Sequence, residues 1–270
     1  MNRIKKVQIE TIRDCNGKCR ICDYRYNRPQ ALYMSGRVFR GIIKVISELP
    51  MLETVCLYNH NEPLLDPKIF KRIRFVKKKL RQARIELSTN GMLFREDDSS
   101  VFNTYCRVVD DRWVSFHGID RDSYEKVMGL PWENGEKIRR LIISRPETRF
   151  VISVGLVGYT KEQVEDFWAG YNVKVMTFIP RDRAGNIKSD MVLSFNSPRN
   201  PAFDCWRFNK FLVFNTKGHL IPCSNDLKNM HRYANYKMSL GEIEDEREDW
   251  RIMNRIGALT VCRRCEDAWT

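Results

Sequence analysis

The sequence lacks any apolar run close to the roughly 18 residues that a membrane-spanning helix needs. It also lacks an export signal, because the basic opening MNRIKKVQIETIRD continues directly into a strand-like pattern. Internal repeats and low-complexity tracts are absent, and 43% of the residues are hydrophobic, which is too many for a disordered chain. We therefore expect a globular, cytoplasmic protein with no membrane partner.

The cysteines lack the even count of a secreted disulfide framework, because there are nine of them. Seven fall into two groups, which indicates metal binding. The first group is Cys15, Cys19 and Cys22, and the second is Cys205, Cys223, Cys262 and Cys265. Cys56 and Cys106 stand alone, and a lone cysteine in a strand-like run usually belongs to the core.

Acidic residues are absent from residues 68–84, which hold nine basic residues within a chain of net charge +13. Ile69, Ile73, Val76 and Leu80 fall on one stripe of a helix, so the charges line its other face. This pattern favours a solvated outer helix, and the alternative is a docking surface for an anionic partner. RNA binding is the rival function from another class, but no RNA-binding motif is present, and we do not expect a nucleic-acid partner.

Strand-like and helix-like segments alternate over the first 180 residues. The strand-like runs are 6–11, 54–58, 84–89, 112–118, 149–157 and 172–180, and the helix-like stretches are 35–49, 67–80, 122–128, 134–144 and 160–169. This alternation predicts an α/β fold with a parallel sheet, as in a partial (β/α)6 TIM-like barrel. After a boundary near residue 198, a β-hairpin turning at Lys217–Gly218 and a short helix predict a small second domain over 199–270.

The first cysteine group, in CNGKCRIC, has the spacing C-x3-C-x2-C and follows the first predicted strand. In a parallel barrel, this places the cysteines at the carboxyl ends of the strands, where active sites lie. Three thiolates can bind three irons of a [4Fe–4S] cluster and leave the fourth iron open for another ligand. The alternative is a zinc site completed by His60 or Asp23.

This spacing after the first strand resembles the signature of the radical SAM superfamily. The resemblance implies that S-adenosylmethionine (SAM) binds the open iron and is cleaved reductively to a 5′-deoxyadenosyl radical, which abstracts hydrogen from a substrate. LYNHNEPLL at 57–65 resembles the segment that receives the methionine amino group, with Asn61 and Glu62 at its key positions. ELSTNG at 86–91 resembles the ribose-contacting segment, with Ser88 and Asn90, and Ser115 would face SAM from the next strand.

The second cysteine group could hold zinc or a fully ligated [4Fe–4S] cluster, and its composition alone leaves both open. Its layout, together with SLGEIEDEREDW at 239–250, resembles the SPASM domain of radical SAM enzymes in its short "twitch" form. The 2-deoxy-scyllo-inosamine dehydrogenases have a similar layout with one auxiliary cluster. The resemblance implies an auxiliary [4Fe–4S] cluster that accepts electrons, and a flavodoxin- or ferredoxin-type donor for the first cluster.

Three reactions could follow hydrogen abstraction. A dehydrogenase would oxidise an alcohol, and an epimerase would return hydrogen from a thiol such as Cys56 or Cys106. A peptide maturase would form a new bond, but the first strand begins so early that we expect no peptide-binding module ahead of it. Arg181, Asp182 and Arg183 follow the sixth strand and could bind hydroxyls or phosphate, unless they form an ordinary charged loop. We therefore expect oxidation of a small polar or phosphorylated substrate, such as a sugar or aminocyclitol.

Overall fold

The computed structural model describes residues 3–28, 30–194, 205–226, 231–255 and 265. Six parallel strands lie side by side in chain order, as a partial TIM-like barrel requires. They are β1 (Lys6–Ile9), β4 (Thr54–Cys56), β5 (Arg84–Thr89), β6 (Asp111–Ser115), β7 (Phe150–Gly155) and β8 (Val173–Phe178). The expected α/β fold with a partial barrel is confirmed, and the third strand has the predicted limits.

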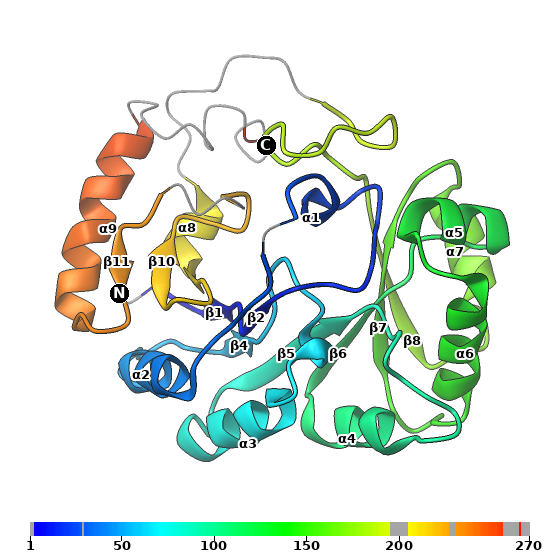
Figure 1. The fold of residues 1–270 in the computed structure, drawn as a ribbon, viewed down its shortest axis with the longest axis horizontal. Coiled ribbons are helices and arrows are strands. Elements are labelled where there is room, and N and C mark those ends of the chain that lie inside the picture. Colours follow the sequence, from blue (N-terminus) through cyan, green and yellow to red (C-terminus); the bar gives the residue numbers. More distant parts are fainter. Residues whose placement is uncertain (1–2, 29, 195–204, 227–230, 256–264, 266–270) are drawn as a thin grey trace.

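Helices connect successive parallel strands along the outer side of the sheet (Figure 1). They are α2 (Gly36–Ile46), α3 (Ile69–Lys79), α4 (Ser100–Val108), α5 (Arg121–Met128), α6 (Trp132–Ile143) and α7 (Lys161–Phe167). Of the helices that the structure describes, none is both long and apolar enough to cross a membrane.

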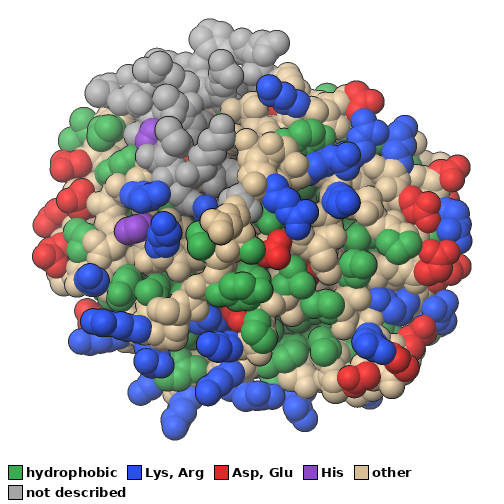
Figure 2. Space-filling model, viewed as in Figure 1, with side chains coloured by type: hydrophobic (Ala, Val, Ile, Leu, Met, Phe, Trp, Pro, Cys, Tyr) green, Lys and Arg blue, Asp and Glu red, His purple; other side chains and the backbone are tan. Residues whose placement is uncertain are grey.

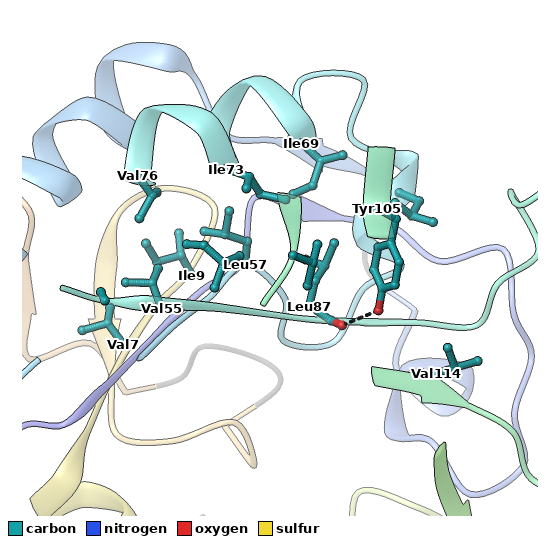
Figure 3. Close-up of a cluster of buried hydrophobic side chains, with 14 of the residues drawn as sticks. Val7, Ile9, Val55, Leu57, Ile69, Ile73, Val76, Leu87, Tyr105 and Val114 are labelled. Atoms are coloured by element: carbon teal, nitrogen blue, oxygen red, sulfur yellow. Dashed lines mark hydrogen bonds between the residues drawn. The ribbon is translucent and has the colours of Figure 1, made fainter. Parts of the chain in front are cut away.

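The core lies between the barrel strands and these outer helices. Figure 3 shows Val7, Val55 and Leu87 from three strands directed toward Ile73 and Val76 of α3. Because side chains alternate along a strand, the residues between these apolar positions face the inside of the barrel. The sheet therefore has an apolar outer face, while its inner face is free to carry other chemistry.

The basic segment forms the outer helix α3, as its pattern predicts. Ile73 and Val76 are fully buried against the sheet, whereas Lys71 and Arg74 are exposed. Figure 2 shows Lys and Arg side chains gathered along the lower edge of the view, where α2 and α3 lie. The exception is Arg72, which is buried and ion-paired with Asp66 at 2.8 Å. The basic face is directed to solvent on the outside of the barrel.

Helix α4 is one of the elements that the sequence pattern does not predict. Its sequence, SVFNTYCRV, is rich in β-branched and aromatic residues, which have weak helix propensity. Burial of Phe102, Tyr105 and Val108 stabilises it, and the Tyr105 hydroxyl donates to the Leu87 carbonyl at 2.9 Å (Figure 3). Tertiary packing thus overrides local propensity here.

The described C-terminal elements are three strands, which extend the barrel sheet beyond β1, and two helices. They are α8 (Trp206–Lys210), β9 (Phe211–Phe214), β10 (His219–Ile221), β11 (Ala234–Asn235) and α9 (Leu240–Arg255). Strand β9 pairs in parallel with β1, and β10 pairs with β9 as the antiparallel hairpin that the sequence predicts. The expected domain boundary near residue 198 lies outside the described residues and stays a prediction.

The hairpin turn depends on Gly218. Its φ of +78° is a conformation that side chains rarely adopt, and an added Cβ would lie 2.5 Å from the ring of Tyr236 and 2.7 Å from Val38. The glycine therefore allows the hairpin to pack closely against neighbouring parts of the chain.

The burial of one face of α3 predicts that alanine substitutions at two isoleucines change the free energy of unfolding by different amounts. Ile73→Ala should lower the free energy of unfolding by about 2–5 kcal/mol, because it removes a fully buried side chain from the core. Ile143→Ala is the matched control, since Ile143 also lies in a helix but is 60% exposed. Denaturant unfolding measures both, and equal losses for the two variants would contradict this packing.

Candidate active site

Three cysteines face one cavity. Cys15, Cys19 and Cys22 lie between β2 (Ile12–Arg13) and α1 (Asp23–Tyr26), in the segment that follows β1. All three line a cavity of about 750 Å³, a size typical of small-molecule sites. The Glu62 backbone N–H donates to the Asp14 carbonyl at 2.9 Å, which ties this segment to the loop after β4. The cysteines thus lie at the carboxyl ends of the barrel strands, as their position in the sequence predicts.

The cysteine loop is held in place by its neighbours. The backbone N–H groups of Lys18 and Arg20 donate to the carbonyls of Met128 and Val127, at 3.4 and 2.8 Å. The Cys19 sulfur lies 3.8 Å from the Met128 sulfur. On the other side, β2 pairs with β3 (Leu32–Tyr33) in a short antiparallel ladder. The end of α5 and this ladder therefore fix the loop that carries the cysteines.

The cysteine sulfurs suit an iron–sulfur cluster. A Cβ added at Gly17 would lie 3.6 Å from the Cys15 sulfur and 3.7 Å from the Cys19 sulfur, so these sulfurs flank one backbone position. Burial raises the pKa of both thiols to about 12, and it also raises the pKa of Cys22. Such thiols become ligands when a metal displaces their protons. Among the described residues, no three His, Cys, Asp or Glu side chains are grouped closely enough to hold a single metal ion.

His60 is engaged elsewhere and does not complete a zinc site. Its Nδ1 lies 2.9 Å from the Asp23 carboxylate, and its Nε2 contacts the Ser224 carbonyl oxygen. Burial alone would raise the pKa of Asp23, but His60 and Arg183 lower it to about 2. Both ring nitrogens of His60 are therefore occupied by protein oxygens. The contact connects the segment after Cys22 with the segment after Cys223.

Glu62 links the loop after β4 to the end of β5. Its Oε1 accepts hydrogen bonds from the Leu64 N–H at 3.0 Å and the Thr89 hydroxyl at 2.7 Å, and its Oε2 accepts from the Asn90 N–H at 2.8 Å. Burial raises the pKa of Glu62 to about 7, although these three donors favour the charged form. The carboxylate also caps the short 3-10 helix η1 (Pro63–Leu65). It lines the cavity at the predicted position.

Asn61 presents an unpaired amide next to Glu62. Its Oδ1 accepts from the Asn59 N–H at 2.8 Å, while its Nδ2 is buried without a partner in the described part of the chain. The side-chain amide of Asn59 is buried and unpaired as well. Buried polar groups normally have partners, so these amides fit a polar ligand in the cavity that both residues line.

Ser88, Asn90 and Ser115 come together as their motifs predict. The hydroxyls of Ser88 and Ser115 lie 3.4 Å apart on neighbouring strands. The Asn90 Nδ2 donates to the Asn16 Oδ1 at 2.7 Å, which connects the end of β5 to the cysteine loop. All three predicted residues line the same cavity as the cysteines. Their contacts with SAM stay predictions.

The remaining catalytic candidates separate into two groups. Arg181 and Arg183 line the cavity, whereas Cys56 and Cys106 are not among its lining residues. Cys56 is fully buried in β4, with its sulfur 3.4 Å from the Glu86 carboxylate. Cys106 lies on the outer helix α4. The structure thus favours a core position for both thiols over contact with a substrate.

The second cysteine group is only partly described. The Cys205 sulfur accepts from the Phe208 N–H at 3.5 Å, and the buried Cys265 sulfur lies 3.8 Å from the Asn225 Nδ2. Asn225 and Ser224 follow Cys223 directly and line the same cavity as the first group. Cys262 lies outside the described residues, so the predicted second cluster stays a prediction.

Sequence reasoning missed the polar residues inside the barrel. Lys6, Gln8, Tyr58, Trp113 and Ser153 line the cavity. The signal was present in the sequence, because in KVQI of β1 the polar residues alternate with Val and Ile. In a strand whose apolar residues face the helices, such alternation places the polar side chains inside the barrel.

The raised pKa of Glu62 predicts a pH-dependent stability. In the folded chain the group keeps its proton up to about pH 7 instead of its usual 4.5, so its stabilising contribution is complete below pH 4.5 and is lost as the pH rises through 7. In iron-free wild-type protein, the free energy of unfolding should therefore fall by at most about 1.4 kcal/mol per pH unit over this range because of Glu62. Glu62→Gln should not show this fall. Unfolding curves at several pH values measure the slope, with Glu165→Gln as an exposed control. Parallel slopes for wild type and Glu62→Gln would contradict the assignment.

The contact between Asp23 and His60 predicts a large loss on truncation. His60→Phe should lower the free energy of unfolding by about 3 kcal/mol, because it leaves the buried Asp23 carboxylate without its partner. His219→Phe is the matched control, since the His219 Nδ1 has no partner among the described residues. Denaturant unfolding of the iron-free proteins makes the comparison. A His60 variant as stable as the control would show that the contact contributes nothing.

The fold of this chain is similar to that of several solved structures. The structure is similar to that of BtrN in complex with AdoMet and 2-DOIA, with a TM-score of 0.67, 15% identity, and coverage of 97% of this chain and 93% of that one. SuiB from Streptococcus suis, bound to the precursor peptide SuiA, gives a TM-score of 0.68 at 14% identity, over 93% of this chain and 65% of SuiB. At such identities the likeness concerns the fold.

A third solved structure, anSMEcpe with bound AdoMet and Cp18Cys peptide, gives a TM-score of 0.67 at 16% identity and covers 97% of this chain and 86% of that one. These three neighbours are SPASM/twitch radical SAM enzymes, as the layout of the sequence predicts. No curated protein matches the sequence. The family model of the Radical SAM superfamily matches residues 9–169, which include the cysteine loop and all five of the predicted SAM-binding residues. The chain therefore belongs to the radical SAM superfamily.

Proposed function

We propose that this chain cleaves SAM reductively and oxidises an alcohol of a small polar substrate of the sugar or aminocyclitol type. One observation carries the proposal. Cys15, Cys19 and Cys22 line the same cavity as the polar side chains inside the barrel. A site for the family's cofactors and space for a polar substrate therefore lie next to each other.

The family implies a [4Fe–4S] cluster and SAM, and the residues of the cavity fit them. The three cysteines would hold the cluster, and Asn61, Glu62, Ser88, Asn90 and Ser115 would bind SAM. When bound, this cluster supplies the electron that splits SAM into methionine and a 5′-deoxyadenosyl radical that takes a hydrogen atom from the substrate. The chain itself would position the substrate, because the cysteine loop and the strand ends line the same cavity.

After hydrogen abstraction, the substrate radical becomes a ketone by giving one electron to an acceptor and its hydroxyl proton to water or a basic side chain in the cavity. Cys205, Cys223, Cys262 and Cys265 would hold the acceptor, an auxiliary [4Fe–4S] cluster. The hydrogen bond between Asn225 and Cys265, and the position of Ser224 and Asn225 on the cavity wall, support an acceptor beside the substrate. A flavodoxin- or ferredoxin-type protein would supply the electron for the first cluster.

Peptide modification is the second candidate, and the solved structures favour it. SuiB is bound to a precursor peptide, and anSMEcpe is bound to the Cp18Cys peptide. Epimerisation has less support, because neither Cys56 nor Cys106 lines the cavity as a thiol hydrogen donor would. RNA binding has less support too, because the basic face of α3 lies on the outside of the barrel.

The assigned cluster ligands predict a selective loss of activity. Reconstituted protein, given SAM and a reductant without oxygen, should release 5′-deoxyadenosine, which chromatography measures. Cys22→Ala should abolish this release, because two thiolates remain where three are needed. Cys106→Ala is the matched control on the outer helix and should retain full release. Wild-type protein that binds iron but releases no 5′-deoxyadenosine would overturn the proposal.

The same preparations separate the reaction types when they are given sugars, aminocyclitols, nucleotide sugars and short peptides. Ketone formation from a polyol would support the dehydrogenase, and solvent deuterium entering the substrate without net oxidation would instead indicate an epimerase. A cross-linked peptide would indicate a maturase. For a dehydrogenase, Cys205→Ala should cleave SAM without forming the ketone.

A further inference from the structure

The inner wall of the barrel carries a set of polar and aromatic side chains that the binding of SAM does not use. We call Lys6, Gln8, Tyr58, Trp113 and Ser153 the polar wall, because all five line the cavity from β1, β6, β7 and the end of β4. In closed eight-stranded TIM barrels, layers of branched apolar residues fill the interior. Here polar side chains replace that packing and leave a space suited to a ligand.

Glu86 of β5 supports the polar wall from behind. The Lys6 ammonium donates to both of its carboxylate oxygens, at 2.9 and 2.7 Å, and the Tyr58 hydroxyl donates to Oε1. Burial alone would lower the pKa of Lys6, but Cys56 and Glu86 raise it, so the ammonium keeps its charge. The pair of Lys6 and Glu86 is then neutral in sum, and the Tyr58 oxygen still has lone pairs for a ligand.

Three other groups of the polar wall have no hydrogen-bond partner in the described part of the chain. The Gln8 amide, the Trp113 indole N–H and the Ser153 hydroxyl make no side-chain hydrogen bond to the described residues, although each residue lines the cavity. Polar groups that line a cavity bind water or a ligand, and several donors and acceptors that converge on one space are typical of a specific polar site.

The polar wall also has aromatic surface. The Lys6 ammonium lies 5.6 Å from the ring centre of Phe211, which lines the cavity together with Trp113. Aromatic rings bury large apolar areas, and their faces pack well against the C–H groups of a saturated ring. A ligand with hydroxyls around its edge and C–H groups on its face would satisfy both parts of the wall.

We propose that the polar wall binds a saturated ring bearing several neutral hydroxyl groups, with Gln8, Tyr58 and Ser153 on its hydroxyls and Trp113 against one face. These three side chains are uncharged donors and acceptors, and they match neutral hydroxyls without needing an opposite charge on the ligand. The inference deepens the proposed function and rests on it for the assignment of this ring as the substrate.

Binding to the SAM-loaded, reconstituted enzyme tests the inference by calorimetry. The probes are myo-inositol and glucose, compared with cyclohexanol, which has one hydroxyl, and with myo-inositol 1-phosphate. We expect a neutral polyol to bind more tightly than both comparison compounds. No binding of either polyol, or tighter binding of cyclohexanol or the phosphate, would overturn the inference.

Gln8→Leu should weaken binding of the polyol about tenfold, because it removes roughly one good hydrogen bond to the ligand. Its thermal midpoint should stay near that of wild type, since the Gln8 amide has no partner among the described residues. Gln82→Leu is the matched control, because Gln82 is exposed, and it should bind as wild type does. Ser153→Ala is a second variant that should also weaken binding. Unchanged affinity in both Gln8→Leu and Ser153→Ala would contradict the inference.

The two proposals can fail separately. Release of 5′-deoxyadenosine by wild-type protein without any probe tests the proposed function alone. If wild type cleaves SAM but binds no polyol, the substrate class assigned to the polar wall is wrong and the radical SAM activity stands. If it binds the polyol but never cleaves SAM, the proposed function is wrong and the polyol site stands without its assignment as the substrate site.

Discussion

The arrangement of the cavity wall depends on the hydrogen bonds that the buried Glu62 side chain accepts. Its two oxygens accept hydrogen bonds from the loop after β4 and from the end of β5, and its backbone N–H bonds to Asp14 beside the first cysteine. Three segments far apart in the sequence therefore meet at one residue. Burial without these donors would be costly for an acidic side chain, so the site and the local fold stabilise each other.

The barrel separates structural from chemical demands by the alternation of side chains. Residues such as Val7 and Leu87 face the helices and form the core, as Figure 3 shows. Their neighbours along the same strands, such as Gln8 and Ser88, face the cavity. Substitution of an inner residue can thus change the ligand while leaving the helix-facing core intact, and this arrangement allows one fold to serve many substrates.

The sequence allows the fold and much of the site to be predicted, for identifiable reasons. Runs such as RIELST are dense in β-branched and apolar residues, which predict strands, and the cysteine spacing predicts a metal site. Helix α4 could not be predicted in this way, because the packing of Tyr105 rather than propensity stabilises it. The contact between His60 and Asp23 joins a loop residue to the first residue of α1, 37 positions away, and no periodic pattern predicts such a pair. The second cysteine group stays a prediction, since Cys262 lies outside the described residues.

The central claim is that three cysteines hold an iron cluster with one iron open to SAM. Mössbauer spectroscopy of protein reconstituted with ⁵⁷Fe, recorded with and without SAM, tests it most directly, because it resolves individual iron sites. The account predicts that one iron of the first cluster changes its spectrum when SAM is added, while the irons bound by cysteine do not. A cluster whose irons are all unaffected by SAM, or a chain that holds no iron at Cys15, Cys19 and Cys22, would contradict it.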